Sequence, residues 1–110
     1  MESKYQYRLS QKAETDLEDI ISYLAVELCN PQAASAFADK LKNVIDEACS
    51  FPESGSPVSN AFLPYPEIRK KLVGSYVMYY LSVPEERMVY VLRLVYGRRN
   101  MDEILRELDL

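Results

Sequence analysis

The sequence predicts an α+β fold with the element order β-α-α-β-β-β-α, in which a helical hairpin packs on one face of a small, mainly antiparallel sheet. Three observations support this class: two apolar stripes with helical spacing, three later runs rich in β-branched and aromatic residues, and short turns between them. The length of 110 residues suits one hydrophobic core, so we expect a single domain over residues 1–110. The other sheet face is expected to remain partly open.

The first half of the chain is predicted to form one strand and two helices. Alternation over Tyr5–Leu9 is typical of a short strand, and Ser10 is suited to cap a helix over residues 11–29. Asn30 followed by proline suits the start of a second helix, which should run to about Ser50. The break between the helices is so short that they should form an antiparallel hairpin.

The second half is predicted to form a loop, a three-stranded meander and a last helix. Phe51–Pro66 contains four prolines, so we expect an irregular loop there. The strands should be separated by turns short enough for hairpins. The expected strands cover residues 68–73, 76–83 and 87–96, and the expected helix covers residues 101–108 with Asn100 as its cap.

Charge is distributed unevenly along the chain. The whole chain has a formal net charge of −4, whereas residues 68–99 contain seven Lys/Arg and two Asp/Glu and carry +5. A basic sheet within an acidic protein is expected to hold an anion or to be covered by an acidic partner.

Composition excludes several classes of site. The chain has no His, which removes the commonest general base and the commonest transition-metal ligand, and we expect neither a metal site nor a cofactor. Its two cysteines, Cys29 and Cys49, are expected to be buried free thiols. No apolar run is long enough to span a bilayer and no signal peptide is apparent, so a cytoplasmic location is expected.

The predicted sheet carries several cations. Alternation along a strand should place Arg69 and Lys71 on one face and Lys70 on the other. In the last strand it should place Val89, Val91, Arg93 and Val95 on one face.

Arg93 is a charge within an otherwise apolar strand. Two interpretations are open: an ion pair with a helix carboxylate, or contact with an anion or a partner on the open face.

Other groups near the end of the last strand could bind anions or bases. Arg98 and Arg99 can donate forked hydrogen bonds to phosphates or carboxylates. The tyrosines of the meander could stack on bases, although packing within the sheet is the alternative for each. These tyrosines are Tyr76, Tyr79, Tyr80, Tyr90 and Tyr96.

Several motifs, in order, resemble the RelE/ParE superfamily of type II toxin–antitoxin toxins. The first half contains Y-x-Y-x-L-S and A-x-x-D-L-x-x-I-x-x-Y-L within Tyr5–Leu24, then N-P-Q-A-A-x-x-F and F-P-E-S-G. The second half contains I-R-K-K-L-V-x-x-Y-x-M-Y-Y within residues 68–80 and V-Y-V-L-R-L-V-Y-G-R-R-N within residues 89–100. The resemblance covers nearly the whole chain, and its last motif looks closer to ParE than to RelE.

The resemblance implies a growth-inhibiting toxin that a cognate antitoxin neutralises, in a toxin–antitoxin hetero-oligomer. A ParE-like toxin would poison DNA gyrase. A RelE-like toxin would instead cleave mRNA on the ribosome, and an inactive relative would only bind its antitoxin. The resemblance implies, for a nuclease, catalytic roles for Arg69, Lys71, Arg93, Tyr96 and Arg99. The residues expected to bind target or antitoxin are Arg69, Lys70, Lys71, Arg93, Arg98 and Arg99.

Overall fold

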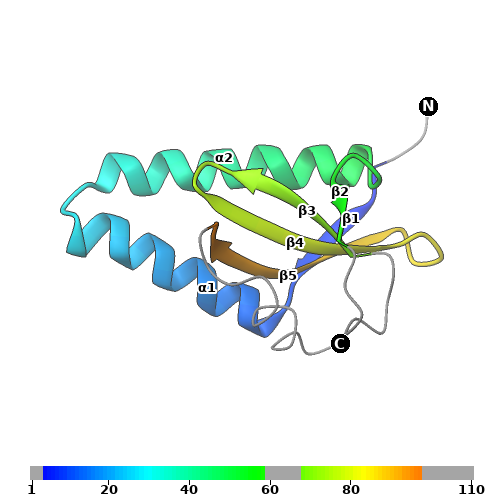
Figure 1. Cartoon of the computed structure of the whole chain (residues 1–110), viewed down its shortest axis with the longest axis horizontal. Coiled ribbons are helices and arrows are strands. Elements are labelled where there is room, and N and C mark those ends of the chain that lie inside the picture. The colour runs from blue at the N-terminus through cyan, green and yellow to red at the C-terminus, as the bar shows by residue number, and fades with distance from the viewer. Residues whose placement is uncertain (1–3, 59–67, 98–110) are drawn as a thin grey trace.

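The computed structural model describes residues 4–58 and 68–97, and it confirms the α+β class (Figure 1). The helices are α1 (Gln11–Ser22), the short π-helix η1 (Tyr23–Glu27) and α2 (Pro31–Ser50). The strands are β1 (Gln6–Leu9), β2 (Ser56–Pro57), β3 (Ile68–Val73), β4 (Tyr76–Val83) and β5 (Met88–Tyr96). The helix predicted over residues 101–108 lies outside the described residues.

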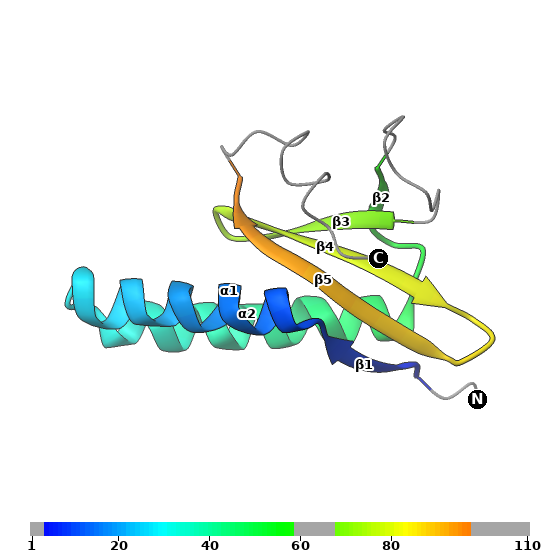
Figure 2. The ribbon, with the colours of Figure 1, turned by 90° about the horizontal axis from the view of Figure 1, so that it is seen from below.

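The strands form one mixed sheet with the helical hairpin on one face. The strand order is β1-β5-β4-β3-β2, with β1 parallel to β5 and every other neighbouring pair antiparallel. Figure 2 shows α1 and α2 together on the same side of this sheet. None of the described helices combines the length and the apolar character needed to cross a membrane.

Most predicted boundaries are confirmed, and the differences have local causes. The first helix does not continue as a regular α-helix to Cys29, because its hydrogen bonding widens to a π-helix after Ser22. The last strand begins at Met88, since Arg87 has a φ of 52° and belongs to the preceding turn. The strand β2 was not predicted, because two residues are too few for an alternating pattern.

The N-cap of α1 also joins the helix to the sheet. Ser10 Oγ accepts a hydrogen bond from the Ala13 N–H (3.0 Å) and donates one to the carbonyl of Leu92 (2.8 Å). We therefore expect Ser10→Ala to lower the free energy of unfolding by about 1–2 kcal/mol, because a cap and a strand contact are lost together. Urea unfolding measures this loss. Ser22→Ala is a matched control, since Ser22 makes no capping hydrogen bond, and an equal loss in both variants would contradict the prediction.

Two clusters of buried side chains lie on opposite faces of the sheet. The cluster under the helices joins residues of α1 and α2, such as Ile20 and Leu41, to Met78 and Tyr80 of β4. The second cluster, on the other face, includes Tyr79. On this face Tyr79 and Ile68 are buried, whereas Leu72, at the other end of β3 from Ile68, is 72% exposed.

The predicted alternation along β5 is wrong beyond Val91. Tyr79 is level with Arg93 whereas the next residue, Tyr80, is level with Val91, so Leu92 has no partner in the register. This β-bulge shifts the side-chain period by one residue. As a result Leu94, not Arg93, continues the face that packs against the helices.

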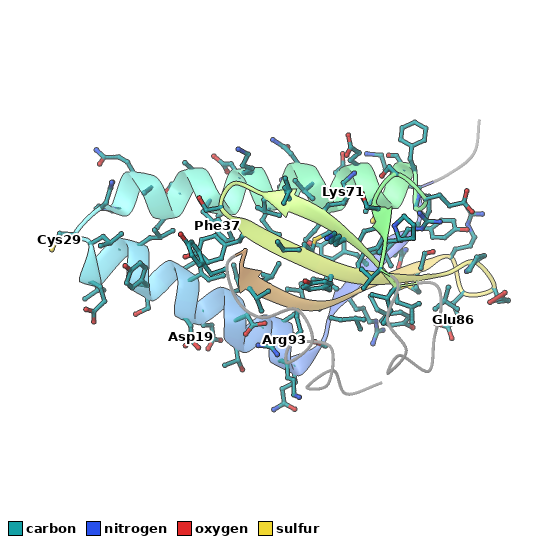
Figure 3. The ribbon with its side chains drawn as sticks, viewed as in Figure 1. Asp19, Cys29, Phe37, Lys71, Glu86 and Arg93 are labelled. Carbon is teal, nitrogen blue, oxygen red and sulfur yellow. The ribbon has the colours of Figure 1, made fainter. Side chains whose placement is uncertain are left out.

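The two cysteines differ in environment. Cys49 is buried as expected, and burial raises the pKa of its thiol, with Asp46 raising it further. The same expectation was wrong for Cys29, which is exposed and lies at the end of the helical hairpin (Figure 3). It has a φ of 50°, so it occupies the turn between η1 and α2 and not the apolar helix face.

Candidate functional site

The predicted cationic residues that the structure describes, Arg69, Lys70, Lys71 and Arg93, do not gather at one place. Arg69 and Lys71 lie level with Tyr80 and Met78, on the face that packs against the helices. Lys70 is level with Tyr79 and therefore lies on the opposite face. Figure 3 shows that Lys71 lies beside α2, whereas Arg93 lies beside α1.

Lys71 and Arg69 hold a short segment that follows α2, which we call the strap (residues 52–57). Lys71 Nζ donates to Ser54 Oγ (2.8 Å) and forms an ion pair with Glu47. Arg69 Nη1 donates to the carbonyl oxygen of Gly55 (2.8 Å) and more weakly to that of Glu53 (3.3 Å). Both cations therefore have structural partners within the described chain.

Tyr80 holds the same strap from the protein interior. Its side chain is fully buried, and its hydroxyl accepts from the Gly55 N–H (2.9 Å) and donates to the Pro52 carbonyl (2.9 Å). For Tyr80, the packing alternative is confirmed over base stacking. The F-P-E-S-G motif thus forms a segment that is held against β3 and β4.

Arg93 forms a buried ion pair with Asp16 of α1. Its Nε lies 2.8 Å from Asp16 Oδ2 and its Nη2 lies 3.2 Å from Oδ1, and the Leu94 N–H also donates to Oδ2 (3.0 Å). Arg93 is only 7% exposed. Of the two interpretations left open by the sequence, the structure shows the ion pair with a helix carboxylate.

The remaining candidates lie at or beyond the end of β5. Tyr96 is 45% exposed, and its ring lies edge-on to Tyr76 with the centroids 5.7 Å apart. Arg98 and Arg99 lie outside the described residues, so their predicted roles stay predictions.

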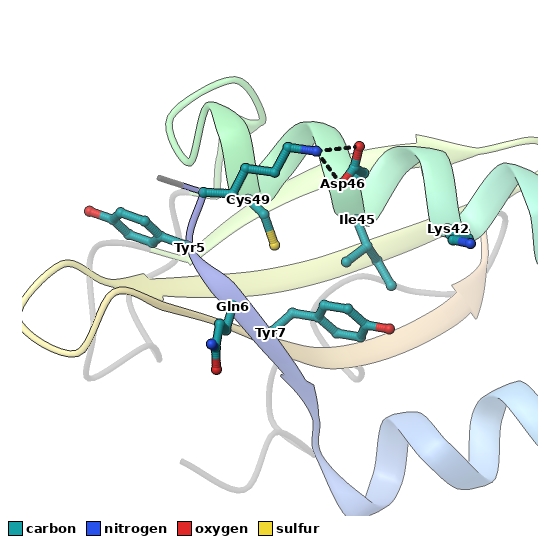
Figure 4. A pocket seen from close by; sticks show the side chains of 8 residues that line it. Tyr5, Gln6, Tyr7, Lys42, Ile45, Asp46 and Cys49 are labelled. Carbon is teal, nitrogen blue, oxygen red and sulfur yellow. Dashed lines mark hydrogen bonds and ion pairs between the residues drawn. The ribbon is translucent and has the colours of Figure 1, made fainter. Parts of the chain in front are cut away.

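A surface pocket of about 330 Å³ lies between β1 and the second half of α2 (Figure 4). Tyr5 and Tyr7 line it from the strand, and Ile45 and Cys49 line it from the helix. At its edge Lys4 Nζ forms an ion pair with Asp46 (2.8 Å). The sequence contained no signal for this pocket, which arises because β1 passes beneath α2.

The described residues offer little for acid–base chemistry. None of them form a group of acidic or sulfur ligands that could hold a metal ion. Burial raises the pKa of Tyr79, and it also raises that of Tyr76, so neither hydroxyl is a ready base near neutral pH. The pocket thiol of Cys49 is likewise held in its protonated form, since its pKa is raised.

Comparison with known proteins identifies relatives of this chain. A family model for the ParE toxin of the type II toxin–antitoxin system parDE matches residues 7–101. Among solved structures, the chain is similar to the RelBE2 toxin–antitoxin complex from Mycobacterium tuberculosis, with 18% identity, a TM-score of 0.61, and 86% of this chain and 99% of that chain covered. It is also similar to the chromosomal ParDE system of P. aeruginosa, with 15% identity, a TM-score of 0.64, and 84% and 96% covered. No curated protein sequence matches significantly.

Proposed function

This chain belongs to the ParE toxin family of type II toxin–antitoxin systems, and from that premise we propose that it arrests growth by poisoning DNA gyrase. A cognate antitoxin neutralises it in a hetero-oligomer in the cytoplasm. The family model covers most of the chain, and both structural relatives are toxin–antitoxin systems. The toxin would act by binding its target, without a cofactor.

One observation favours binding to gyrase over cleavage of mRNA: among the described residues, three of the cations that a nuclease would need are separated and already form contacts within the chain. Arg69 and Lys71 hold the strap, whereas Arg93 lies across the sheet and is paired with Asp16. A nuclease requires donors that converge where charge develops in the transition state, and losing one typically slows the reaction about 10²–10³-fold. Such convergence is lacking among these described residues.

The alternative is a RelE-like nuclease that cleaves mRNA on the ribosome. The observation in its favour is the fold similarity to the RelBE2 complex. In that case Tyr96 is the informative residue, because it is 45% exposed and Tyr96→Phe removes its hydroxyl while keeping the ring that packs on Tyr76. Arg93→Ala is not a clean test, since it disrupts a buried ion pair.

We expect the toxin, freed of its antitoxin, to inhibit DNA supercoiling by purified gyrase and to leave ribosome-bound mRNA intact. Adding the antitoxin should restore supercoiling. Arg98→Ala together with Arg99→Ala should weaken inhibition, because both residues are positively charged and are predicted to bind the target. Lys40→Ala together with Lys42→Ala is the matched control, as it removes two exposed cations from α2.

The two target assignments give opposite results in this assay. Codon-specific cuts in ribosome-bound mRNA, lost in Tyr96→Phe at unchanged stability, would replace the gyrase proposal with the nuclease. A chain that is soluble, binds its antitoxin and affects neither process would be an inactive relative.

A further inference from the structure

The outer edge of the sheet at β1 has backbone groups that face no neighbouring strand. β1 is the outermost strand beside β5, and no strand that the structure describes lies beyond it. The Gln6 N–H and the Ser10 N–H both donate to carbonyls on the β5 side, over 3.0 and 2.9 Å, so alternate residues of this segment face β5. Tyr7 and Leu9 lie at the intervening positions and direct their N–H and carbonyl groups to the outer side. This edge is therefore suited to accept one more strand.

The end of α2 covers the beginning of this edge and leaves a pocket beside the rest. The Tyr5 N–H, on the same side of β1 as that of Tyr7, donates to the Cys49 carbonyl at the end of α2 (3.0 Å). The surface pocket of about 330 Å³ lies next to this contact, between β1 and α2 (Figure 4). Two of its lining residues, Ile45 and Cys49, are buried, whereas Tyr7 lines it from the strand and is 50% exposed. Because ligand sites have volumes of roughly 300–1,000 Å³, this pocket suits one or two apolar side chains better than a cofactor.

The charge around this edge is positive. Residues 4–12 contain three Lys/Arg and no Asp/Glu, a formal charge of +3. Lys42, which is exposed, lines the pocket from α2, and the carboxylate of Asp46 is already paired with Lys4. An acidic segment would be attracted to this edge, and one of its carboxylates could pair with Lys42.

We propose that the β1 edge and its pocket form an anchor site for an extended, acidic segment of the cognate antitoxin. The segment adds a strand beside Tyr7 and Leu9, inserts an apolar side chain into the pocket and places a carboxylate at Lys42. An acidic partner is also expected over residues 68–99, which carry +5 and include β5 beside β1, so one chain can contact both surfaces. The inference rests on the part of the proposed function in which an antitoxin neutralises the toxin, and it does not depend on the identity of the target.

The anchor site is separate from the residues that are predicted to bind the target. β1 pairs with residues 88–91, at the beginning of β5, whereas Arg98 and Arg99 follow the end of that strand in the sequence. Substitutions at the anchor site should therefore weaken neutralisation by the antitoxin and leave the potency of the antitoxin-free toxin unchanged.

Substitutions at the pocket test the anchor site. Tyr7→Ala and Lys42→Glu should each raise the Kd for purified cognate antitoxin by about tenfold or more, because one removes a pocket wall and the other repels a carboxylate. The matched controls are Tyr23→Ala, whose ring in η1 is 49% exposed, and Lys40→Glu, which is exposed on α2 and is not among the pocket residues. Both controls should stay within about threefold of the native Kd. Thermal unfolding of every variant reports changes in fold.

Hydrogen exchange tests the added strand. The amides of Tyr7 and Leu9 should exchange about tenfold or more slowly in the complex than in the free toxin, because the antitoxin supplies their acceptors. The amides of Gln6 and Ser10 are internal controls and should change less, since they already donate towards β5. Exchange of Tyr7 and Leu9 at equal rates in both states would rule out the added strand.

Each further outcome decides for or against the anchor site. Native antitoxin affinity in both Tyr7→Ala and Lys42→Glu, or an equal loss in their controls, would overturn it. Self-association of the antitoxin-free toxin that is lost in Tyr7→Ala, measured by light scattering, would assign the edge to a second copy instead. Reduced antitoxin affinity in a toxin that does not inhibit gyrase would support the anchor site and remove gyrase as the target. A native chain that inhibits gyrase but binds no antitoxin would remove the anchor site alone.

Discussion

Asp16→Ala should lower the free energy of unfolding by about 3–5 kcal/mol, the largest loss we expect from any single substitution in this chain. Asp16 accepts two hydrogen bonds from the Arg93 guanidinium and a third from the Leu94 N–H. Arg93 is 7% exposed, so truncating the carboxylate would leave a buried positive charge without this counter-ion. It would also leave a strand N–H without its acceptor, which adds to the cost.

Equilibrium denaturation in urea measures this loss, and two further variants isolate its cause. Asp19→Ala removes an exposed carboxylate from the same helix and should change stability by less than about 0.5 kcal/mol. Combining Asp16→Ala with Arg93→Met should be less destabilising than Asp16→Ala alone, because the buried guanidinium that has lost this carboxylate is removed as well. If the double variant were the less stable of the two, the buried charge would not be the origin of the effect.

The fold was largely predictable because local signals agree with the tertiary structure. The caps at Ser10 and Asn30, with Pro31 at the first helical position, marked both helix starts. Alternation and short turns located β3 and β4 at their observed bounds. The π-helix at Tyr23–Glu27 could not be predicted, because its apolar pattern is the same as that of an α-helix.

The candidate site was less predictable because it depends on contacts between distant parts of the chain. The sequence indicated that Arg93 needs a partner, but it could not identify Asp16 among the helix carboxylates. The bulge at Leu92, which places Arg93 outside the face that packs against the helices, has no local sequence signal. Strand alternation correctly grouped Arg69 with Lys71. Alternation could not show that both cations form hydrogen bonds with the strap, because these contacts join residues that are 14 and 17 positions apart in the sequence.

We expect the second large loss of stability from Gly55→Ala, a substitution within the strap. A Cβ at this position would lie 2.5 Å from the Tyr80 hydroxyl oxygen and 2.8 Å from the Lys70 carbonyl oxygen. Real Cβ contacts are essentially never that short, and the second neighbour is backbone, so the strap would have to move away from β3. This movement would separate the Gly55 N–H from Tyr80 and the Gly55 carbonyl from Arg69.

We therefore expect Gly55→Ala to lower the free energy of unfolding by about 2–4 kcal/mol, from overpacking together with lost buried hydrogen bonds. Gly74→Ala is the matched control: Gly74 has a φ of 62° and nothing within 4 Å of its Cβ position, so only the backbone cost of about 1 kcal/mol should appear. Tyr80→Phe removes the shared hydroxyl and eases the closest contact. The double variant Gly55→Ala with Tyr80→Phe should therefore lose less free energy of unfolding than the sum of the two single variants. Strictly additive losses would show that the Tyr80 hydroxyl is not what excludes a side chain at position 55.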